Sequence, residues 1–285
     1  MTSERRKQVR VVQRVRLAAL AAAAWAALLS TAAAQPDLIA RARLLYNLEQ
    51  YEQAIAVAEK ARLVAETADA AALVIARARL ERYRRTGDAE DLQYGRQALR
   101  EIRPDALMTA RDRIEYLVGV GEALFLEGQH GPAAELFSSA LANPSTIDPA
   151  LADRILDWWA SALDRKALAL PQDQRAPVYR RIFERLEEVA RRDPYSAAAT
   201  YWLAASARGL GDLDRAWDLA TAGWAAAPLV RQAGSSVRAD IDRLVSEALI
   251  PERAHMLGVD EADRQRLENE LTAAWKAFKE QWTRR

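Results

Sequence analysis

The stretch that most constrains this chain runs from residue 117 to 144, because it has the pattern of two short helices joined by a glycine turn. In the first half, Gly121 lies among larger apolar residues, and Gly128 stands where a left-handed turn would end a helix. In the second half, one apolar stripe has helical spacing and consists of Ala133, Phe137, Ala140 and Leu141. Asn143-Pro144 predicts the end of the second helix. A single hairpin cannot bury such a stripe, so the pattern predicts neighbouring copies of itself.

Four further stretches repeat this pattern on either side of the central one. The predicted hairpins cover residues 37–65, 68–103, 150–192 and 201–228. Gly87 and Gly211 supply the turns of the second and fifth hairpins, whereas Glu49 occupies the corresponding position in the first. The chain is therefore predicted to be all-α, with about five helical hairpins in a row.

The pattern changes after Pro228. A helix is predicted over residues 233–249 and is expected to end at Ile250-Pro251. Asp260 can cap a last helix that carries an apolar stripe of Leu267, Leu271, Trp275, Phe278 and Trp282. This stripe predicts a C-terminal pair of helices, residues 229–285, that caps the row of hairpins, and the alternative is a helix that docks onto a partner.

The small residues around each turn resemble those of the tetratricopeptide (TPR) repeat family. They are Gly128 with Ala133, Phe137 and Ala140; Gly211 with Ala216, Ala220, Gly223 and Pro228; and Tyr51 with Ala54, Ala58 and Ala61. The resemblance implies an α-solenoid over residues 35–228, although an unrelated α-solenoid family would give a similar pattern. It also implies a concave surface that is lined by the first helix of each hairpin and binds a protein or peptide.

The same resemblance gives the residues expected on that concave surface. They are Ile39, Arg43, Tyr46 and Asn47 in the first hairpin, Glu115, Val118, Glu122 and Phe125 in the third, and Tyr201, Ala205 and Arg208 in the fifth. The polar and aromatic members are the predicted partner-binding residues, namely Arg43, Tyr46, Asn47, Glu122, Phe125, Tyr201 and Arg208.

The adjacent residues Trp158 and Trp159 form a second candidate site. Neighbours on a helix point about 100° apart, so both rings cannot face the same partner helix. One ring is expected to pack, and the other can stack on a peptide or a sugar. The alternative is that each ring packs against a different neighbouring helix.

Residue types that carry catalysis or hold metals are scarce in this chain. It contains no cysteine and two histidines, His130 and His255, which belong to different predicted hairpins and have no carboxylate at a metal-ligand spacing. No nucleophile-elbow, P-loop or EF-hand motif occurs in the sequence. We therefore expect a protein that is not an enzyme and that uses no metal or cofactor.

The N-terminus has the three parts of an export signal. A basic region reaches Arg16, an apolar run follows from Leu17 to Leu29, and Ala32 and Ala34 have the small-x-small spacing of a cleavage site. The sequence predicts a bacterial signal peptide over residues 1–34, cleaved after Ala34, and a periplasmic or secreted product. The alternative is an uncleaved inner-membrane anchor, which would be the sole membrane contact.

Removing residues 1–34 changes the charge of the chain. That segment holds six basic residues and one acidic residue, so the formal net charge falls from +1 to −4. A mildly acidic body does not favour nucleic-acid binding. The expected function is a non-enzymatic periplasmic scaffold that binds a protein or peptide on its concave face. The alternative is a glycan-binding helical module or an accessory subunit of a cell-envelope enzyme.

Overall fold

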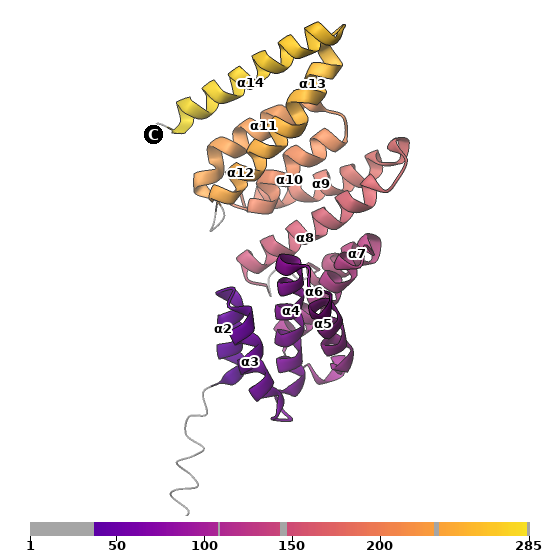
Figure 1. Cartoon of the computed structure of the whole chain (residues 1–285), viewed down its shortest axis with the longest axis vertical. Coiled ribbons are helices and arrows are strands. Elements are labelled where there is room, and N and C mark those ends of the chain that lie inside the picture. The colour runs from indigo at the N-terminus through magenta and orange to yellow at the C-terminus, as the bar shows by residue number, and fades with distance from the viewer. Residues whose placement is uncertain (1–36, 108, 143–146, 231–233, 284–285) are drawn as a thin grey trace, which may run out of the picture. The chain divides into compact units, whose positions relative to one another are not determined.

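The computed structural model describes residues 37–107, 109–142, 147–230 and 234–283, and within these ranges all regular secondary structure is helical (Figure 1). The prediction of an all-α protein is confirmed. The predicted signal peptide and the Asn143-Pro144 helix stop lie outside the described residues. The chain divides into two compact units, unit 1 up to Ala106 and unit 2 from Leu107 onward.

Unit 1 contains four α-helices among its described residues, numbered as in Figure 1: α2 (Leu38–Asn47), α3 (Tyr51–Arg62), α4 (Ala68–Thr86) and α5 (Ala89–Glu101). Each helix packs against the next along the chain. The Asp37 carboxylate accepts the Ala40 amide at 3.0 Å and so caps α2, and Asp88 caps α5 in the same way through Glu90. The first two hairpins therefore lie where the sequence predicts them.

The turn between α2 and α3 has a backbone conformation that glycine normally supplies. Gly87, Gly128 and Gly211 all have positive φ at the corresponding turns, and Glu49 has φ +61°. A side chain with a Cβ is strained in this region. Glu49 thus adopts the conformation of the glycine that it replaces.

Unit 2 holds the remaining helices: α6 (Ala110–Leu126), α7 (His130–Ala140), α8 (Pro149–Leu168), α9 (Ala176–Arg192), α10 (Ala197–Gly209), α11 (Leu213–Ala226), α12 (Gly234–Leu244), α13 (Ile250–Leu257) and α14 (Glu261–Thr283). Successive helices pack in pairs, and the first helices of successive hairpins are also neighbours, since α8 contacts α6 and α10, and α10 contacts α12. These contacts place α10 beside both α8 and α12.

In the central hairpin, the aromatic ring of Phe137 packs against Gly121. A Cβ placed on Gly121 of α6 would lie 2.7 Å from Cε1 of Phe137, and the three heavy atoms nearest to that Cβ all belong to this ring. Phe137 and Ala133 of α7 are fully buried. Gly121 of α6 therefore lies directly against an aromatic side chain of α7.

The predicted helix break at Ile250-Pro251 is wrong. α12 continues through a π-helical segment, Val245–Leu249, directly into α13. Proline in a helix lacks an amide donor and crowds the carbonyl four residues earlier. Here the Ile250 amide donates to Val245, five residues back, and the wider π-helical turn accommodates Pro251 in the first turn of α13.

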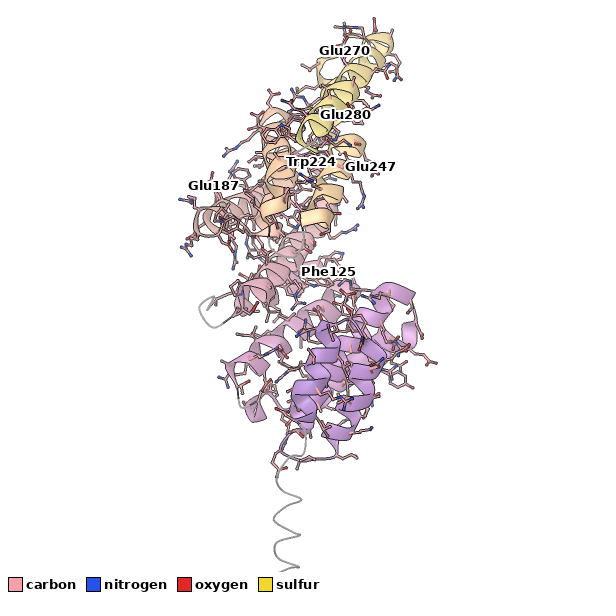
Figure 2. All side chains as sticks on the ribbon, turned by 90° about the vertical axis from the view of Figure 1, so that its left-hand side faces the viewer. Phe125, Glu187, Trp224, Glu247, Glu270 and Glu280 are labelled. Atoms are coloured by element: carbon pink, nitrogen blue, oxygen red, sulfur yellow. The ribbon has the colours of Figure 1, made fainter. Side chains whose placement is uncertain are left out.

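The C-terminal helix α14 returns against the preceding helices (Figures 1 and 2). Asp260 accepts the Asp263 amide at 2.9 Å and caps it as predicted. Its buried residue is Trp275, which meets Trp217 and Trp224 of α11 in edge-to-face contacts at 6.0 and 6.1 Å. Among the described helices, none combines the length and the apolar composition that a membrane crossing requires.

Candidate functional site

Helix α10 carries two of the predicted partner-binding residues, Tyr201 and Arg208. Tyr201, Ala205 and Arg208 lie at i, i+4 and i+7 on α10, and all three are partly buried. The neighbouring helices α8 and α12 contact α10 on this side. We call the surface around Tyr201 the α10 face.

Carboxylates of two neighbouring helices act on the Tyr201 hydroxyl. Burial is the main cause that raises the pKa of Tyr201, and the negative charges of Asp240, Asp164 and Asp157 raise it further. Asp157 and Asp164 belong to α8, and Asp240 belongs to α12. Tyr201 therefore lies near carboxylates of both neighbouring helices, and the charge of Arg208 acts on its pKa in the opposite direction.

Neutral donors orient the two α8 carboxylates. The Trp202 indole Nε1 donates to Asp157 at 2.8 Å, and the Tyr179 hydroxyl donates to Asp164 at 2.9 Å. Burial and the charge of Asp164 together raise the pKa of Tyr179 to about 12, so this hydroxyl stays protonated as a donor. Neither bond neutralises its carboxylate, because both donors are uncharged.

A glycine allows Tyr179 to reach Asp164. A Cβ on Gly209, at the end of α10, would lie 2.4 Å from Cδ1 of the Tyr179 ring. The ring of a buried tyrosine therefore lies directly against the α10 backbone. Any larger residue at position 209 would displace Tyr179 and with it the orientation of Asp164.

Arg208, on the α10 face, forms an ion pair with Glu252. Its Nε lies 3.0 and 2.9 Å from the two oxygens of Glu252 on α13, and its Nη2 is 2.5 Å from Oε1. The hydrogen bond to Glu252 raises the pKa of Arg208, and burial opposes that rise. Arg208 lies on the predicted surface, but its guanidinium already has a carboxylate partner.

A partly buried aromatic cluster joins α6, α7 and α8. Phe125, labelled in Figure 2, makes edge-to-face contacts with His130 at 5.0 Å and with Trp158 at 4.9 Å. The Phe137 ring also lies near Trp158, with 5.9 Å between the ring centres. Of the predicted stacking pair, Trp158 is partly buried, whereas Trp159 is fully buried. Trp159 is thereby removed as a stacking residue, because no external ligand can reach its ring.

Several predicted surface residues of α6 and α2 are buried instead. Glu115, Val118 and Glu122 share one face of α6, as their spacing predicts, but they are 5%, 1% and 1% exposed. Ile39 of α2 is 6% exposed. Helical periodicity places residues on a common face, but it does not show whether that face is open or packed. Glu122 in particular is not available to a partner in this structure.

The predicted residues of the first hairpin belong to unit 1. Asn47 is exposed, and Arg43 and Tyr46 are partly buried. The Tyr46 ring lies 5.6 Å from Tyr51 and has the Arg77 guanidinium 4.9 Å above it. Tyr46, Tyr51 and Arg77 therefore form an aromatic cluster within unit 1.

The carboxylates of the α10 face were not predicted from the sequence. Asp157 and Asp164 have the same i, i+7 spacing on α8 that Tyr201 and Arg208 have on α10. This spacing was the one sequence signal that could have indicated these two carboxylates. Within the described ranges, no three His, Asp or Glu side chains converge closely enough to hold a metal ion.

Comparisons with known proteins add no assignment. Scans against protein-family models, curated proteins and solved structures all gave no match.

Proposed function

We propose that this protein is a non-enzymatic scaffold that binds an extended segment of a partner protein on the α10 face. The observation that carries the proposal is the position of Tyr201, a partly exposed ring that lies near carboxylates of the neighbouring helices α8 and α12. Exposed aromatic side chains are enriched where proteins bind partners. The proposal includes a TPR-like α-solenoid, and its periplasmic or secreted location rests on the N-terminal sequence alone.

The chemistry of the face favours a segment with a basic side chain. A Lys or Arg placed over the Tyr201 ring would gain a cation–π contact and would lie among Asp157, Asp164 and Asp240. The cluster of Phe125 and Trp158 can receive an apolar side chain of the same segment.

Site-specific photo-crosslinking tests this function. A photoreactive phenylalanine analogue replaces Tyr201 in one variant and Tyr195 in a control, since Tyr195 is 46% exposed and precedes α10. We expect one cell-envelope protein to be captured from position 201 and not from position 195, and the change Asp240→Lys should abolish its capture. Equal capture from both positions, or capture that persists in Asp240→Lys, would show that the α10 face does not bind the partner.

A glycan ligand is the second candidate, and the partial exposure of Trp158 favours it. Sugars stack on aromatic rings, and Trp158 lies beside a second ring, Phe125. Titration of tryptophan fluorescence with peptidoglycan fragments separates the two functions. A saturable change that disappears in Trp158→Ala would support the glycan, and no change would leave the protein segment as the ligand.

A further inference from the structure

Aromatic rings in unit 2 repeatedly carry a cation that is also paired with a carboxylate. Arg215 lies over Phe183 and pairs with Glu187, Arg253 lies over Trp217 and pairs with Asp214, and Lys279 lies over Trp275 and pairs with Asp242. In each case the carboxylate balances the charge that the ring helps to hold.

Arg185 departs from this arrangement. Its guanidinium lies 4.7 Å from the centre of the buried Trp159 ring, and its Nη1 donates to the Ser138 hydroxyl of α7 at 3.0 Å. Among the described residues, no carboxylate lies within ion-pair distance of it. Arg238 also has a neutral partner, the Trp224 carbonyl, but that ring carries a single cation. Arg185 is thus a partly buried charge whose hydrogen-bond partner is neutral.

A second cation increases the positive charge at the same place. Arg181, one turn earlier on α9, lies over the same Trp159 ring at 5.8 Å and pairs with Glu135 of α7 at 2.9 Å. Burial lowers the pKa of Arg185, the charge of Arg181 lowers it further, and Glu188 opposes them. Glu188 itself pairs with Arg192. Positive charge is therefore in excess between α7 and α9.

We propose that Arg185, Arg181 and Ser138 form a binding site for an oxyanion, a carboxylate or a phosphate group, on the surface shared by α7 and α9. Arginine has five donors in a planar fork that matches such groups, and Arg185 uses one of them in its bond to Ser138. The Ser138 hydroxyl can donate its own proton to the anion while it accepts from Arg185. The site lies on second helices of the hairpins, so it is separate from the α10 face and independent of the function proposed there.

Anion titration of the protein, followed by NMR of the arginine Nε–Hε groups, tests the site. Inorganic phosphate and acetate are added in separate series at constant ionic strength. The exposed Arg180, on the same helix, serves as the internal control. We expect a saturable shift at Arg185 and none at Arg180, and the anion that saturates at the lower concentration identifies the preferred group.

Two variants complete the test. Arg185→Gln removes the charge, and Ser138→Ala removes one hydroxyl from the surface with little risk to folding. We expect Arg185→Gln to weaken binding about tenfold or more, as for the loss of a charge-assisted hydrogen bond, and Ser138→Ala to weaken it by less. Arg180→Gln should leave binding unchanged. Shifts that stay linear for both anions, or that are equal at Arg185 and Arg180, overturn the proposal, and this result needs no variant to fold.

Discussion

Replacement of Gly121 by alanine tests the packing of the central hairpin. The new Cβ would lie 2.7 Å from Cε1 and 3.0 Å from Cδ1 and Cζ of Phe137, whereas carbon atoms in contact prefer about 3.5–4.0 Å. The Phe137 ring is fully buried and also lies near Trp158, with 5.9 Å between the ring centres, so it has little freedom to move away. Overpacking of this kind costs about 1–3 kcal/mol.

A second effect of the same substitution acts in the opposite direction. Alanine is favoured over glycine inside a helix by about 0.8–1.0 kcal/mol. The net expectation for Gly121→Ala is a loss of about 1 kcal/mol, which lowers the melting temperature by about 2–4 °C in a protein of this size. Thermal and urea unfolding, followed by circular dichroism, measure both quantities.

Gly131→Ala is the matched control for this prediction. Gly131 lies in the first turn of α7, and the atom nearest to a Cβ there is Cδ of Lys166 at 3.9 Å, an ordinary contact. This variant should gain stability or stay unchanged, so the two variants should differ by about 1–3 kcal/mol. If Gly121→Ala is as stable as Gly131→Ala, the ring does not lie against Gly121 and the packing described for the hairpin is wrong.

Three further changes should be measurable by the same unfolding assays. Glu49→Gly should stabilise the protein by about 0.5–1 kcal/mol because it relieves a strained positive φ, whereas Glu49→Gln, which keeps the Cβ, should not. Ala133→Leu should lower the free energy of unfolding by about 1–3 kcal/mol because Ala133 is fully buried, whereas Gln129→Leu in the exposed turn should lower it little. Equal melting temperatures of the two variants would contradict the hairpin register. Burial and the charge of Arg165 lower the pKa of His130 in the folded protein, so the free energy of unfolding decreases as the pH falls below about 6.5. His130→Gln should remove this part of the pH dependence of stability, and an unchanged pH profile would contradict the assignment to His130.

Helix positions could be predicted because their signals are local. The Asp37 and Asp260 caps and the glycine turns act within a few residues, and each helix begins or ends near them. Pro251 shows the limit of local reasoning. A proline predicts a break, but the π-helical segment before it removes the clash and the helix continues to Leu257.

The candidate site was less predictable because exposure depends on packing between helices. Tyr201 and Glu122 were chosen by the same rule, and the structure leaves Tyr201 partly exposed but buries Glu122. The carboxylates near Tyr201 come from helices more than thirty residues away in either direction. No periodicity within one helix contains that information, whereas the contact of α10 with α8 and α12 does.

The docking of α14 depends on one tryptophan and one aspartate. Trp275 is 2% exposed and donates its Nε1 to Asp242 of α12 at 2.7 Å, and Lys279 pairs with the same carboxylate. Burial alone would raise the pKa of Asp242, but the hydrogen bonds from Lys279 and Trp275 outweigh it, and the pKa falls below 3.8. A lowered carboxylate pKa stabilises the fold above about pH 4, and this contribution is lost as the pH falls through the folded-state value.

These contacts favour a capping role for α14 over docking to a partner. Trp275→Ala should cost about 3–5 kcal/mol, as for a buried tryptophan, whereas Trp282→Ala should cost less than about 1 kcal/mol because Trp282 is 40% exposed. Deletion of residues 260–285 should uncover Trp217 and Trp224 and cause aggregation or a loss of cooperative unfolding. Analytical ultracentrifugation and thermal unfolding measure both effects. If the truncated protein stays monomeric with an unchanged melting curve, α14 does not stabilise α11 and α12, and its apolar stripe is instead available to a partner.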